Sequence, residues 1–544
     1  MKRSFSMILS LIFILTALTA CGDTEKSGAG HSFSYALVGN PDTLDPQLAV
    51  NSSAKTVLAN LFEGLFTLDD NGTVQKGIVK DYRISDDCLR YSFDLRQDSY
   101  WYRAVGDLDG FDKDAAEKVT AADFVFAFQR MFDPVYQSPY RETFSSILHA
   151  REIMEGRQDP SMIGVYARRD DLLEIELEKP DTSLLMKLAE TAALPCNQDY
   201  FQQTKGRYGL DEQSVIGNGS FSMQRWLYDP YGKYNVIQLI RNPLNHAVQK
   251  IYPTDISFFI EETDADAIRI FTDGNADCCV TTQADLLPAA AAEAEGSFSL
   301  TLGIVANPAS DYGKFPAVMQ AMRSALDYSK IASQSDLLPA SGILPPASVL
   351  LNKSCRELIS DITYRQHDPE KGRQLLSSGL SSLPRTELPE GKVLVQNGMM
   401  DYSALRDVLK QWEDTLSIHL SLEEVVPAEY EKRISNAQYD LALITVSGDN
   451  HDPSSVMENF LYAPGLHCTE QNGIRRCLED ASQAQDLTTL VDLYSKAEAA
   501  VLKDSCVIPL FYKKRFLVCK KDIKDVHFNP FSSQVQFRDA KYFG

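Results

Sequence analysis

Apolar residues recur along the chain with two different periods, which predicts helices and strands intermingled from one end to the other. Helical spacing predicts helices over 53–63, 120–133, 315–327, 404–416 and 484–502. Alternating or continuous apolar runs predict strands over 33–38, 91–95, 234–240, 255–260, 418–425 and 439–444, and a terminal hairpin at 507–511 and 515–519. The pattern indicates an α/β chain of several lobes, with the apolar stripes forming its core.

The N-terminus is typical of a secretory signal peptide, residues 1–20. Lys2 and Arg3 precede an apolar stretch over 7–18, which is shorter than the ~20 residues that a membrane span needs. The stretch ends in small residues before Cys21, and it resembles the lipobox of bacterial lipoproteins, whose cysteine is lipidated. Residues 21–30 would then be a lipidated tether that holds the protein at the outer face of the bacterial cytoplasmic membrane, extracellular or periplasmic. The alternative is an ordinary signal peptide cleaved near Ala20.

Length and charge narrow the class of protein. At ~150 residues per domain the remaining chain is too long for one core and suggests about three domains. The chain carries 53 basic and 75 acidic residues, which gives a net charge of −22. A surface of this sign repels other polyanions, so no nucleic-acid partner is expected.

The cysteines indicate structure rather than chemistry. Cys468 and Cys477 end a short polar segment and are disulfide candidates, and such a bond would stabilise the fold by roughly 2.5–3 kcal/mol. Cys278 and Cys279 are adjacent, which favours a buried strand pair over thiol chemistry. No Cys-x-x-Cys occurs, so zinc-ribbon and thioredoxin-like sites have no support.

No catalytic constellation is present in the sequence. There is no Gly-x-Ser-x-Gly, no His-Glu-x-x-His and no phosphate-binding glycine loop. The segment 449–452 (DNHD) offers metal-ligand side chains, but adjacent residues of an extended chain point in opposite directions. We therefore expect no metal, no cofactor and no enzymatic activity; an extracytoplasmic hydrolase is a remote alternative without an identifiable nucleophile–base pair.

A series of short motifs, in order along the chain, resembles the family 5 solute-binding proteins of ABC importers. The motifs are 41–46 (PDTLDP), 61–65 (LFEGL), 91–96 (YSFDLR), 119–124 (VTAADF), 216–221 (IGNGSF), 241–243 (RNP), 319–327 (MQAMRSALD) and 367–371 (HDPEK). The resemblance implies a periplasmic-binding-protein-like α/β fold, with two hinged lobes of mixed sheets and an inserted third domain. It places the first lobe at 31–75, 205–300 and 505–544, the inserted domain at 76–204, and the second, ligand-clasping lobe at 301–504.

The same resemblance implies a function. The chain would be a monomeric, substrate-binding lipoprotein that captures a short peptide with a free N-terminus and delivers it to ABC permease subunits. Its membrane contact would be the lipid on Cys21. Within the same fold the alternative ligands are a nickel chelate, a sugar or an opine-like compound. A different alternative is a peptide receptor or signalling lipoprotein that does not transport.

Site residues follow from the resemblance as well. Peptide-binding members carry an aspartate shortly after a Tyr-Asp strand, which pairs with the ligand's α-amino group, and the spacing places Asp449 there. A buried ammonium needs such a charged partner. Main chain at Thr445 and Val446 would pair with the peptide backbone, and Asn51 and Ser52 match a ligand-facing stretch across the cleft. The sequence departs from the family at Thr445-Val446, where Gly-Trp is common. The alternative for Asp449 is that it caps a turn in an Asp/Asn/Gly-rich loop.

Overall fold

The computed structural model describes residues 30–543 apart from 105–115, 233, 284–291, 332, 352, 360–366, 382–386, 463–470, 485 and 504–506. The predicted signal peptide, Cys21 and most of the predicted tether lie outside these residues, as does Cys468. Within the described ranges, no helix has the length and apolar character needed to cross a membrane.

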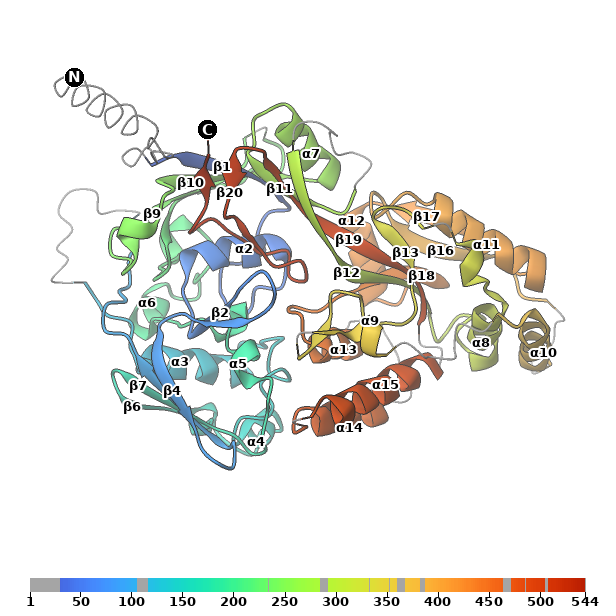
Figure 1. The fold of residues 1–544 in the computed structure, drawn as a ribbon, viewed down its shortest axis with the longest axis horizontal. Coiled ribbons are helices and arrows are strands. Elements are labelled where there is room, and N and C mark those ends of the chain that lie inside the picture. Colours follow the sequence, from blue (N-terminus) through green and yellow to red (C-terminus); the bar gives the residue numbers. More distant parts are fainter. Residues whose placement is uncertain are drawn as a thin grey trace, which may run out of the picture.

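One long sheet runs through the molecule (Figure 1). Its strands, in spatial order, are β17 (Leu420–Val425), β16 (Gly391–Gln396), β18 (Leu441–Val446), β12 (Ala292–Ala306), β19 (Ile508–Lys520), β11 (Cys278–Thr281), β1 (Ser32–Val38), β10 (Asp255–Glu261), β9 (Val236–Arg241) and β8 (Phe221–Leu227), and β13 (Leu337–Pro339) also pairs with β19. Strand β1 runs parallel to β10 and β11, whereas β19 runs antiparallel to β11. The sheet is therefore mixed, and the predicted α/β class is confirmed.

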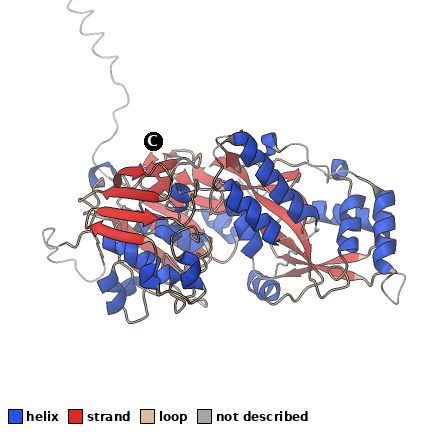
Figure 2. Cartoon of the chain, turned by 90° about the horizontal axis from the view of Figure 1, so that it is seen from below, coloured by secondary structure: helices blue, strands red, loops and turns tan. Residues whose placement is uncertain are grey.

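Two long strands, β12 and β19, join the two ends of this sheet. They pair antiparallel from Ala292 opposite Lys520 to Ile304 opposite Ile508. At the first end β19 also pairs with β11, and at the other end β12 also pairs with β18. We call the part built on β1 and β8–β11 lobe A and the part built on β16–β18 lobe B; Figure 2 shows them side by side. The chain passes between the lobes along β12 and β19.

The predicted terminal hairpin is wrong, because Ile508–Lys520 forms one continuous strand. Basic residues in and next to the expected turn keep the extended conformation, since each finds a partner along the sheet. Lys513 pairs with Asp336 at 3.4 Å, and Lys514 lies 4.8 Å from the centre of the Phe298 ring. Arg515 donates hydrogen bonds to two backbone carbonyls of the segment 530–531.

A second, four-stranded antiparallel sheet packs with lobe A. Its order is β4 (Val79–Ile84), β5 (Arg90–Leu95), β7 (Leu172–Glu176) and β6 (Val165–Arg169). Helix α3 (Ala121–Phe132) contacts β6 and β7. The helix begins as predicted, with the Thr120 backbone N–H donating to Asp123 at 2.7 Å, and it ends before Asp133-Pro134. Buried residues of β5, α3, β1 and β10 belong to one continuous hydrophobic core.

Helix α2 (Ser52–Leu61) lies in lobe A and is held at its C-terminal end by the motif at 216–221. The Asn218 side chain accepts from the Glu63 backbone N–H at 3.0 Å and donates to the Glu63 carbonyl at 2.8 Å. A methyl group added at Gly217 would lie 2.2 Å from the Leu61 carbonyl oxygen. The glycine is therefore required by the close approach of two backbones.

Lobe B places helices on both faces of its part of the sheet. Leu302, Ile304 and Leu443 pack with α8 (Pro316–Ala325), α10 (Pro369–Leu380) and α11 (Ser403–Leu416). The intervening residues Val305 and Ile444 pack on the opposite face with α13 (Pro453–Tyr462), α14 (Gln471–Ala481) and α15 (Leu487–Lys503). Because side chains alternate along a strand, the sheet separates two cores. The predicted helices around 315–327, 404–416 and 484–502 are confirmed.

Shorter elements complete the described part of the chain. They are β2 (Phe66–Leu68), β3 (Val74–Lys76), α4 (Ala150–Met154), α5 (Leu184–Lys187), α6 (Gln198–Gln203), α7 (Asp264–Thr272), β14 (Val349–Leu350), β15 (Lys353–Ser354), α9 (Cys355–Leu358), α12 (Pro427–Ser435), β20 (Ile523–Lys524), β21 (His527–Phe528), β22 (Val535–Gln536), β23 (Lys541–Tyr542), and 3-10 helices η2 (Pro160–Met162), η3 (Thr191–Ala193), η4 (Glu212–Ser214), η5 (Val248–Lys250) and η7 (Tyr328–Lys330).

Candidate functional site

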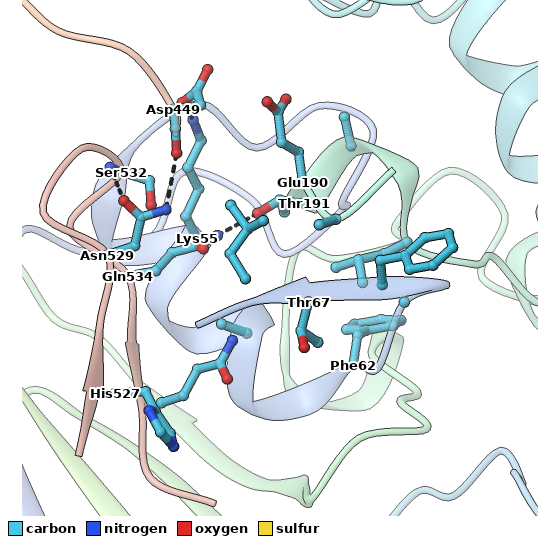
Figure 3. Close-up of a pocket in the computed structure, with 18 of the residues that line it drawn as sticks. Lys55, Phe62, Thr67, Glu190, Thr191, Asp449, His527, Asn529, Ser532 and Gln534 are labelled. Carbon is cyan, nitrogen blue, oxygen red and sulfur yellow. Dashed lines mark hydrogen bonds and ion pairs between the residues drawn. The ribbon is translucent and has the colours of Figure 1, made fainter. Parts of the chain in front are cut away.

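A cavity lies where lobe A meets lobe B (Figure 3). Its empty space is about 830 Å³, which includes open solvent at its mouth. Most of its wall comes from α2 and the C-terminal segment in lobe A and from the residues around η3, and lobe B contributes Asp449. The polar side chains of the wall include Lys55, Asp70, Glu190, Asp449, His527, Asn529, Ser532 and Gln534.

Lobe B also contacts the part of the chain around the four-stranded sheet, which packs with lobe A. The Thr182 backbone N–H donates to the Ser482 carbonyl at 2.8 Å. Arg151 and Lys179 both pair with Glu479, at 3.1 and 3.2 Å. The cavity itself is lined by Lys55 of lobe A and Asp449 of lobe B, so a molecule bound inside it would contact both lobes.

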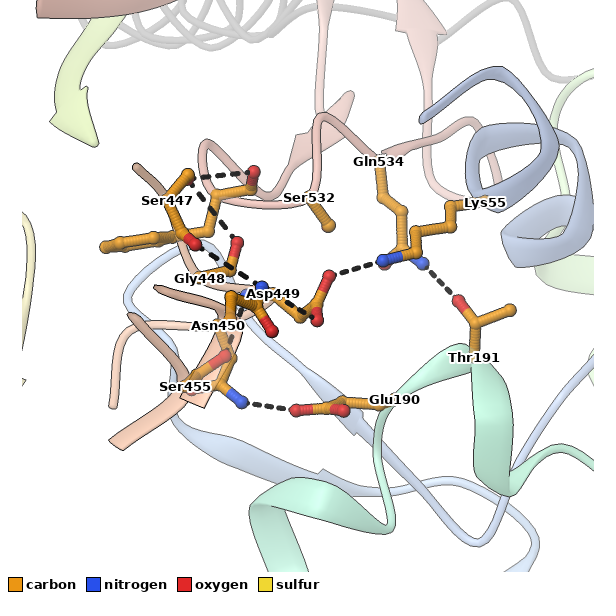
Figure 4. Close-up of polar contacts among 12 residues, drawn as sticks. Lys55, Glu190, Thr191, Ser447, Gly448, Asp449, Asn450, Ser455, Ser532 and Gln534 are labelled. Atoms are coloured by element: carbon orange, nitrogen blue, oxygen red, sulfur yellow. Dashed lines mark hydrogen bonds and ion pairs between the residues drawn. The ribbon is translucent and has the colours of Figure 1, made fainter. Parts of the chain in front are cut away.

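Asp449 lies in the loop between β18 and α13 and is fixed by its backbone. Its N–H donates to the Ser455 hydroxyl at 2.8 Å, and its carbonyl accepts from the Asn529 side chain at 3.0 Å. The carboxylate accepts from Lys55 (Figure 4) and, at 3.3 Å, from Asn459. The loop itself is capped by Asn450, which accepts from the Asp452 backbone at 2.7 Å. The carboxylate of Asp449 therefore bonds to the side chains of Lys55 and Asn459, and not to the backbone of its own turn as the capping alternative requires.

Lys55, on α2 of lobe A, forms an ion pair with Asp449 of lobe B. Burial disfavours the charged form of Lys55, but the carboxylate of Asp449 outweighs burial and raises the pKa of Lys55. Burial likewise opposes ionisation of Asp449, and the Lys55 ammonium overcomes it and lowers the pKa of Asp449. Both groups are therefore charged at neutral pH, and the charge of Asp449 is already balanced by the protein.

Glu190 precedes η3 and lies on the other side of the same cluster. Its carboxylate accepts from the Asn450 side chain. Burial and repulsion by Asp449 raise the pKa of Glu190 to about 8, although Lys55, Asn450 and Lys187 act in the opposite direction. Glu190 is consequently protonated at neutral pH, and the Asp449, Lys55 and Glu190 cluster has no net charge.

Ser532 and His527 are two further polar side chains of the cavity wall. The Ser532 hydroxyl is buried, with the residue only 8% exposed, and it has no hydrogen-bond partner within the described structure. His527 lies between Asp70 and Asp539, at 3.2 and 3.1 Å, and hydrogen bonds to Asp539 and Asp70 raise its pKa to about 10. Ser532 thus offers an unused donor and acceptor, whereas His527 is a cation held by two carboxylates.

The other predicted site residues are placed differently from Asp449. Thr445 and Val446 end β18 and do not line the cavity. Strand β16 pairs only with Leu441 and Ala442 of β18, so in the part of the chain that the structure describes no strand pairs with 443–446 on that side. No strand therefore covers this side of Thr445, which is exposed, or of Val446, which is buried.

Asn51 and Ser52 do not line the cavity either. Asn51 is the N-cap of α2, and its side chain accepts from the Ala54 backbone N–H at 2.8 Å. Ser52 is solvent-exposed. The helix that begins there instead brings Lys55, one turn further on, into the cavity.

The predicted metal and cysteine features lie apart from the cavity chemistry. Among the described residues no group of three or more His, Cys, Asp or Glu side chains is arranged to hold a metal ion. Cys278 and Cys279 are both buried in β11, which confirms the predicted strand pair. Cys477 is half-buried in α14; its pairing with Cys468 stays a prediction, since Cys468 is not described.

Sequence reasoning missed Lys55 and Glu190, two residues of the cavity wall that act on the charge of Asp449. Lys55 is the only charged residue of α2. This could have pointed to the site, because a lone charge on an otherwise neutral helix often has a buried partner. Glu190 gave no signal, since it lies in an irregular segment and meets Asp449 only through the packing of the two lobes.

Comparison with known proteins identifies a family. The model of the bacterial extracellular solute-binding proteins, family 5 (middle part) matches residues 73–466. The chain is 22% identical to the oligopeptide-binding protein OppA of Bacillus subtilis over 569 aligned residues, which cover 100% of both chains. It is also 22% identical to a dipeptide-binding protein of Lactococcus lactis subsp. cremoris, over 99% of this chain and 100% of the relative.

Solved structures show the same fold. OppA of Listeria monocytogenes, determined with a bound peptide, superposes with a TM-score of 0.76 at 18% identity and covers 95% of this chain and 100% of its own. The expected periplasmic-binding-protein-like architecture is therefore confirmed.

Proposed function

Because the chain belongs to the bacterial extracellular solute-binding proteins of family 5, we propose that it captures a short peptide with a free N-terminus between its two lobes and delivers it to an ABC importer. The family consists of binding proteins, not enzymes. The relatives described above are named for binding oligopeptides and dipeptides, and one was solved with a peptide bound. They support a peptide as the ligand of this chain.

The observation that carries the proposal is the position of Asp449. Its carboxylate lies in a cavity that lobe A and lobe B build together, away from bulk water. An ammonium that leaves water requires a charged partner at a fixed place, and two backbone hydrogen bonds fix Asp449. We assign Asp449 to the ligand's α-amino group.

The backbone of the peptide would pair with the edge of β18 at Thr445 and Val446, which no strand covers in the described structure. Unpaired N–H and C=O groups at a strand edge accept an added strand, and such pairing reads the backbone without regard to side chains. Asn51 supports the site indirectly, because it caps the helix that carries Lys55. Ser52 would contribute only if a longer ligand reached the start of α2.

Closure of the two lobes would trap the ligand in the cavity. The two lobes are joined by β12 and β19, and both contribute residues to the cavity wall. A ligand that touches both lobes stabilises the closed arrangement, so binding and closure are one equilibrium. The permease subunits would recognise this closed form of a monomeric binding protein.

Lipidation of Cys21 would anchor the protein at the outer face of the cytoplasmic membrane, with residues 21–30 as a tether. The lipobox-like sequence before Cys21 supports this assignment. Several acyl chains on one cysteine hold firmly, because each buried methylene contributes about 0.8 kcal/mol.

One observation favours a second candidate. Lys55 already neutralises Asp449, so a solute without an ammonium, such as an N-blocked peptide or a sugar, would leave the ion pair intact. This candidate keeps the same family, cavity and importer and differs only in the ligand.

A thermal-shift screen of residues 22–544 separates the candidates. The ligands are pooled di- to octapeptides, the same peptides N-acetylated, sugars and a nickel chelate. A ligand at 100 times its Kd should stabilise the protein by about 2.7 kcal/mol. We expect a shift with free-amine peptides that disappears on acetylation. An equal shift with acetylated peptides, or a shift with a sugar or nickel chelate alone, would refute the proposed ligand.

A further inference from the structure

The charges around the cavity are unevenly paired. Lys55 holds Asp449, and Lys187 holds Asp181 at 3.1 Å. Glu190 has no cationic partner within ion-pair distance in the described structure, although it lies in the same cavity wall as Lys55 and Asp449. Both lysines therefore form ion pairs with other carboxylates, and neither of them pairs with Glu190.

This pairing creates a difficulty for a ligand ammonium. An ammonium that approaches Asp449 places a second positive charge beside Lys55, and one carboxylate cannot balance two buried cations. A further carboxyl group in the same cavity wall is Glu190, whose ionised form helps to raise the pKa of Lys55. Figure 4 shows Glu190, Asp449 and Lys55 around one space, approached from three different segments.

We propose that Glu190 is the second carboxylate of the amine site: it carries a proton before the ligand binds and releases that proton to water when a ligand ammonium binds beside Asp449. The exchange balances, because one ammonium enters and one proton leaves. Asp449 and Glu190 then face Lys55 and the ligand ammonium, two anions against two cations. The inference rests on the proposed function and adds Glu190 as the residue whose loss of a proton balances the positive charge of the ligand.

An independent feature points to a ligand at this place. The Ser532 hydroxyl lines the same cavity and is more than nine-tenths buried, yet it has no hydrogen-bond partner within the described residues. Buried hydroxyls are seldom left without a partner, since losing hydration without replacement costs free energy. An ammonium has three donors, so it can serve Asp449, Glu190 and the acceptor of Ser532 together.

The protonation of Glu190 follows from its surroundings. Burial and the neighbouring Asp449 raise the pKa of Glu190 to about 8. The charged and titratable groups that share a pocket wall with it or act on its pKa are Lys55 on α2, Lys187 on α5, Asp449 and Asp452 before α13, Glu458 on α13, Tyr140, and Asp69, Asp70 and His527. Burial also raises the pKa of Glu458 to about 7, and Glu458 lines a second, smaller pocket with Glu190 and Asp449 but does not line the cavity with Lys55. Glu458 is therefore a matched control carboxyl.

Calorimetry on the chain from residue 22 to 544 tests the inference. Trialanine and the best free-amine peptide of the screen are titrated near pH 6.5 in two buffers of different ionisation enthalpy, which gives the number of protons released. We expect about one proton per peptide, and an association constant that rises about tenfold per pH unit from about pH 5.5 to 7. Glu190→Gln should release none and lose that pH dependence, whereas Glu458→Gln should still release about one.

The outcomes separate the inference from the proposed function. Binding without proton release, or equal release by wild type and Glu190→Gln, overturns the role of Glu190 and leaves the peptide ligand intact. No binding of any free-amine peptide overturns both. An infrared difference spectrum between wild type and Glu190→Gln at pH 6.5, without ligand, adds a test that needs no peptide. A carboxylic-acid band from Glu190 is the expected result, and a carboxylate band alone contradicts the inference.

Discussion

Lys55 and Asp449 form an ion pair between the two lobes, although 394 positions separate them in the sequence. Their side chains are only 11% and 20% exposed, so the pair has largely lost its hydration. The pair therefore links the electrostatics of the cavity to the closure of the lobes. It also means that the residue expected to hold a ligand's amine has a partner from the protein itself.

A double-mutant cycle measures this link. Lys55→Met leaves a poorly hydrated carboxylate without its cation, and Asp449→Asn leaves the lysine without its anion, whereas the double variant removes both charges. We expect a coupling free energy of unfolding of about 1–3 kcal/mol between the two sites. The exposed pair Lys496 and Asp492 on α15 is the control and should couple by less than about 0.5 kcal/mol. Equal coupling in both cycles would refute the special role of the inter-lobe pair.

Lys55→Met should also change ligand binding. Without Lys55, Asp449 is free for the ligand ammonium, so the affinity for a free-amine peptide should rise by about tenfold or more, with Lys55→Arg unchanged within a few-fold. Proton release should fall as well, since one cation then meets one carboxylate. Isothermal titration of the three proteins with the same peptide gives both quantities. A lower affinity of Lys55→Met would show that Lys55 contacts the ligand favourably.

The motif at 216–221 predicts a stability effect without a binding effect. Gly217→Ala places a methyl group 2.2 Å from the Leu61 carbonyl oxygen, and backbone cannot move aside as a side chain can. We expect a loss of about 1–3 kcal/mol in the free energy of unfolding, measured by denaturant titration. Gly156→Ala is a control with open space around the added methyl, although its positive φ of 73° adds some backbone strain. A Gly217→Ala protein as stable as wild type would mean that α2 is not held by this contact.

His527 predicts a pH dependence of stability at alkaline pH. Hydrogen bonds to Asp539 and Asp70 raise its folded pKa to about 10, above its ordinary value of 6.5. A raised pKa of a base stabilises the fold fully below pH 6.5, and this contribution is lost as the pH rises through 10. The difference in melting temperature between wild type and His527→Gln should therefore shrink between pH 6.5 and 10. The groups are partly exposed, so the difference should be small, and a difference that grows with pH would contradict this assignment.

Periodicity predicted most of the regular structure. The apolar faces of α3, α8 and α11, like the strands of the main sheet, are formed by residues that lie close together in the sequence. Periodicity failed at Ile508–Lys520, where a run of basic residues looked like a turn. Those side chains find partners in Asp336 and Phe298, which are distant in sequence, so no local pattern could show that the strand continues. The residue boundaries of the domains stay predictions.

The site was predictable only in part. A family motif placed Asp449, and the structure brings it into a cavity between the lobes. Asn51 and Ser52 match a family stretch, but in this chain Asn51 caps α2. Glu190 and Lys55 become neighbours of Asp449 only when both lobes are folded and in contact. Charge balance in a cavity is a property of that assembly, so a linear motif predicts one member of the cluster and not its partners.

The most direct test of the account is the affinity of Asp449→Asn for a free-amine peptide, measured by isothermal titration beside the same peptide N-acetylated. The matched control is Asp440→Asn, which removes a carboxylate that does not line the cavity. The account predicts at least a 30-fold loss for Asp449→Asn, equivalent to about 2 kcal/mol, wild-type affinity for Asp440→Asn, and no binding of the acetylated peptide. An Asp449→Asn protein that binds the free-amine peptide as tightly as wild type would contradict the assignment of the amine site.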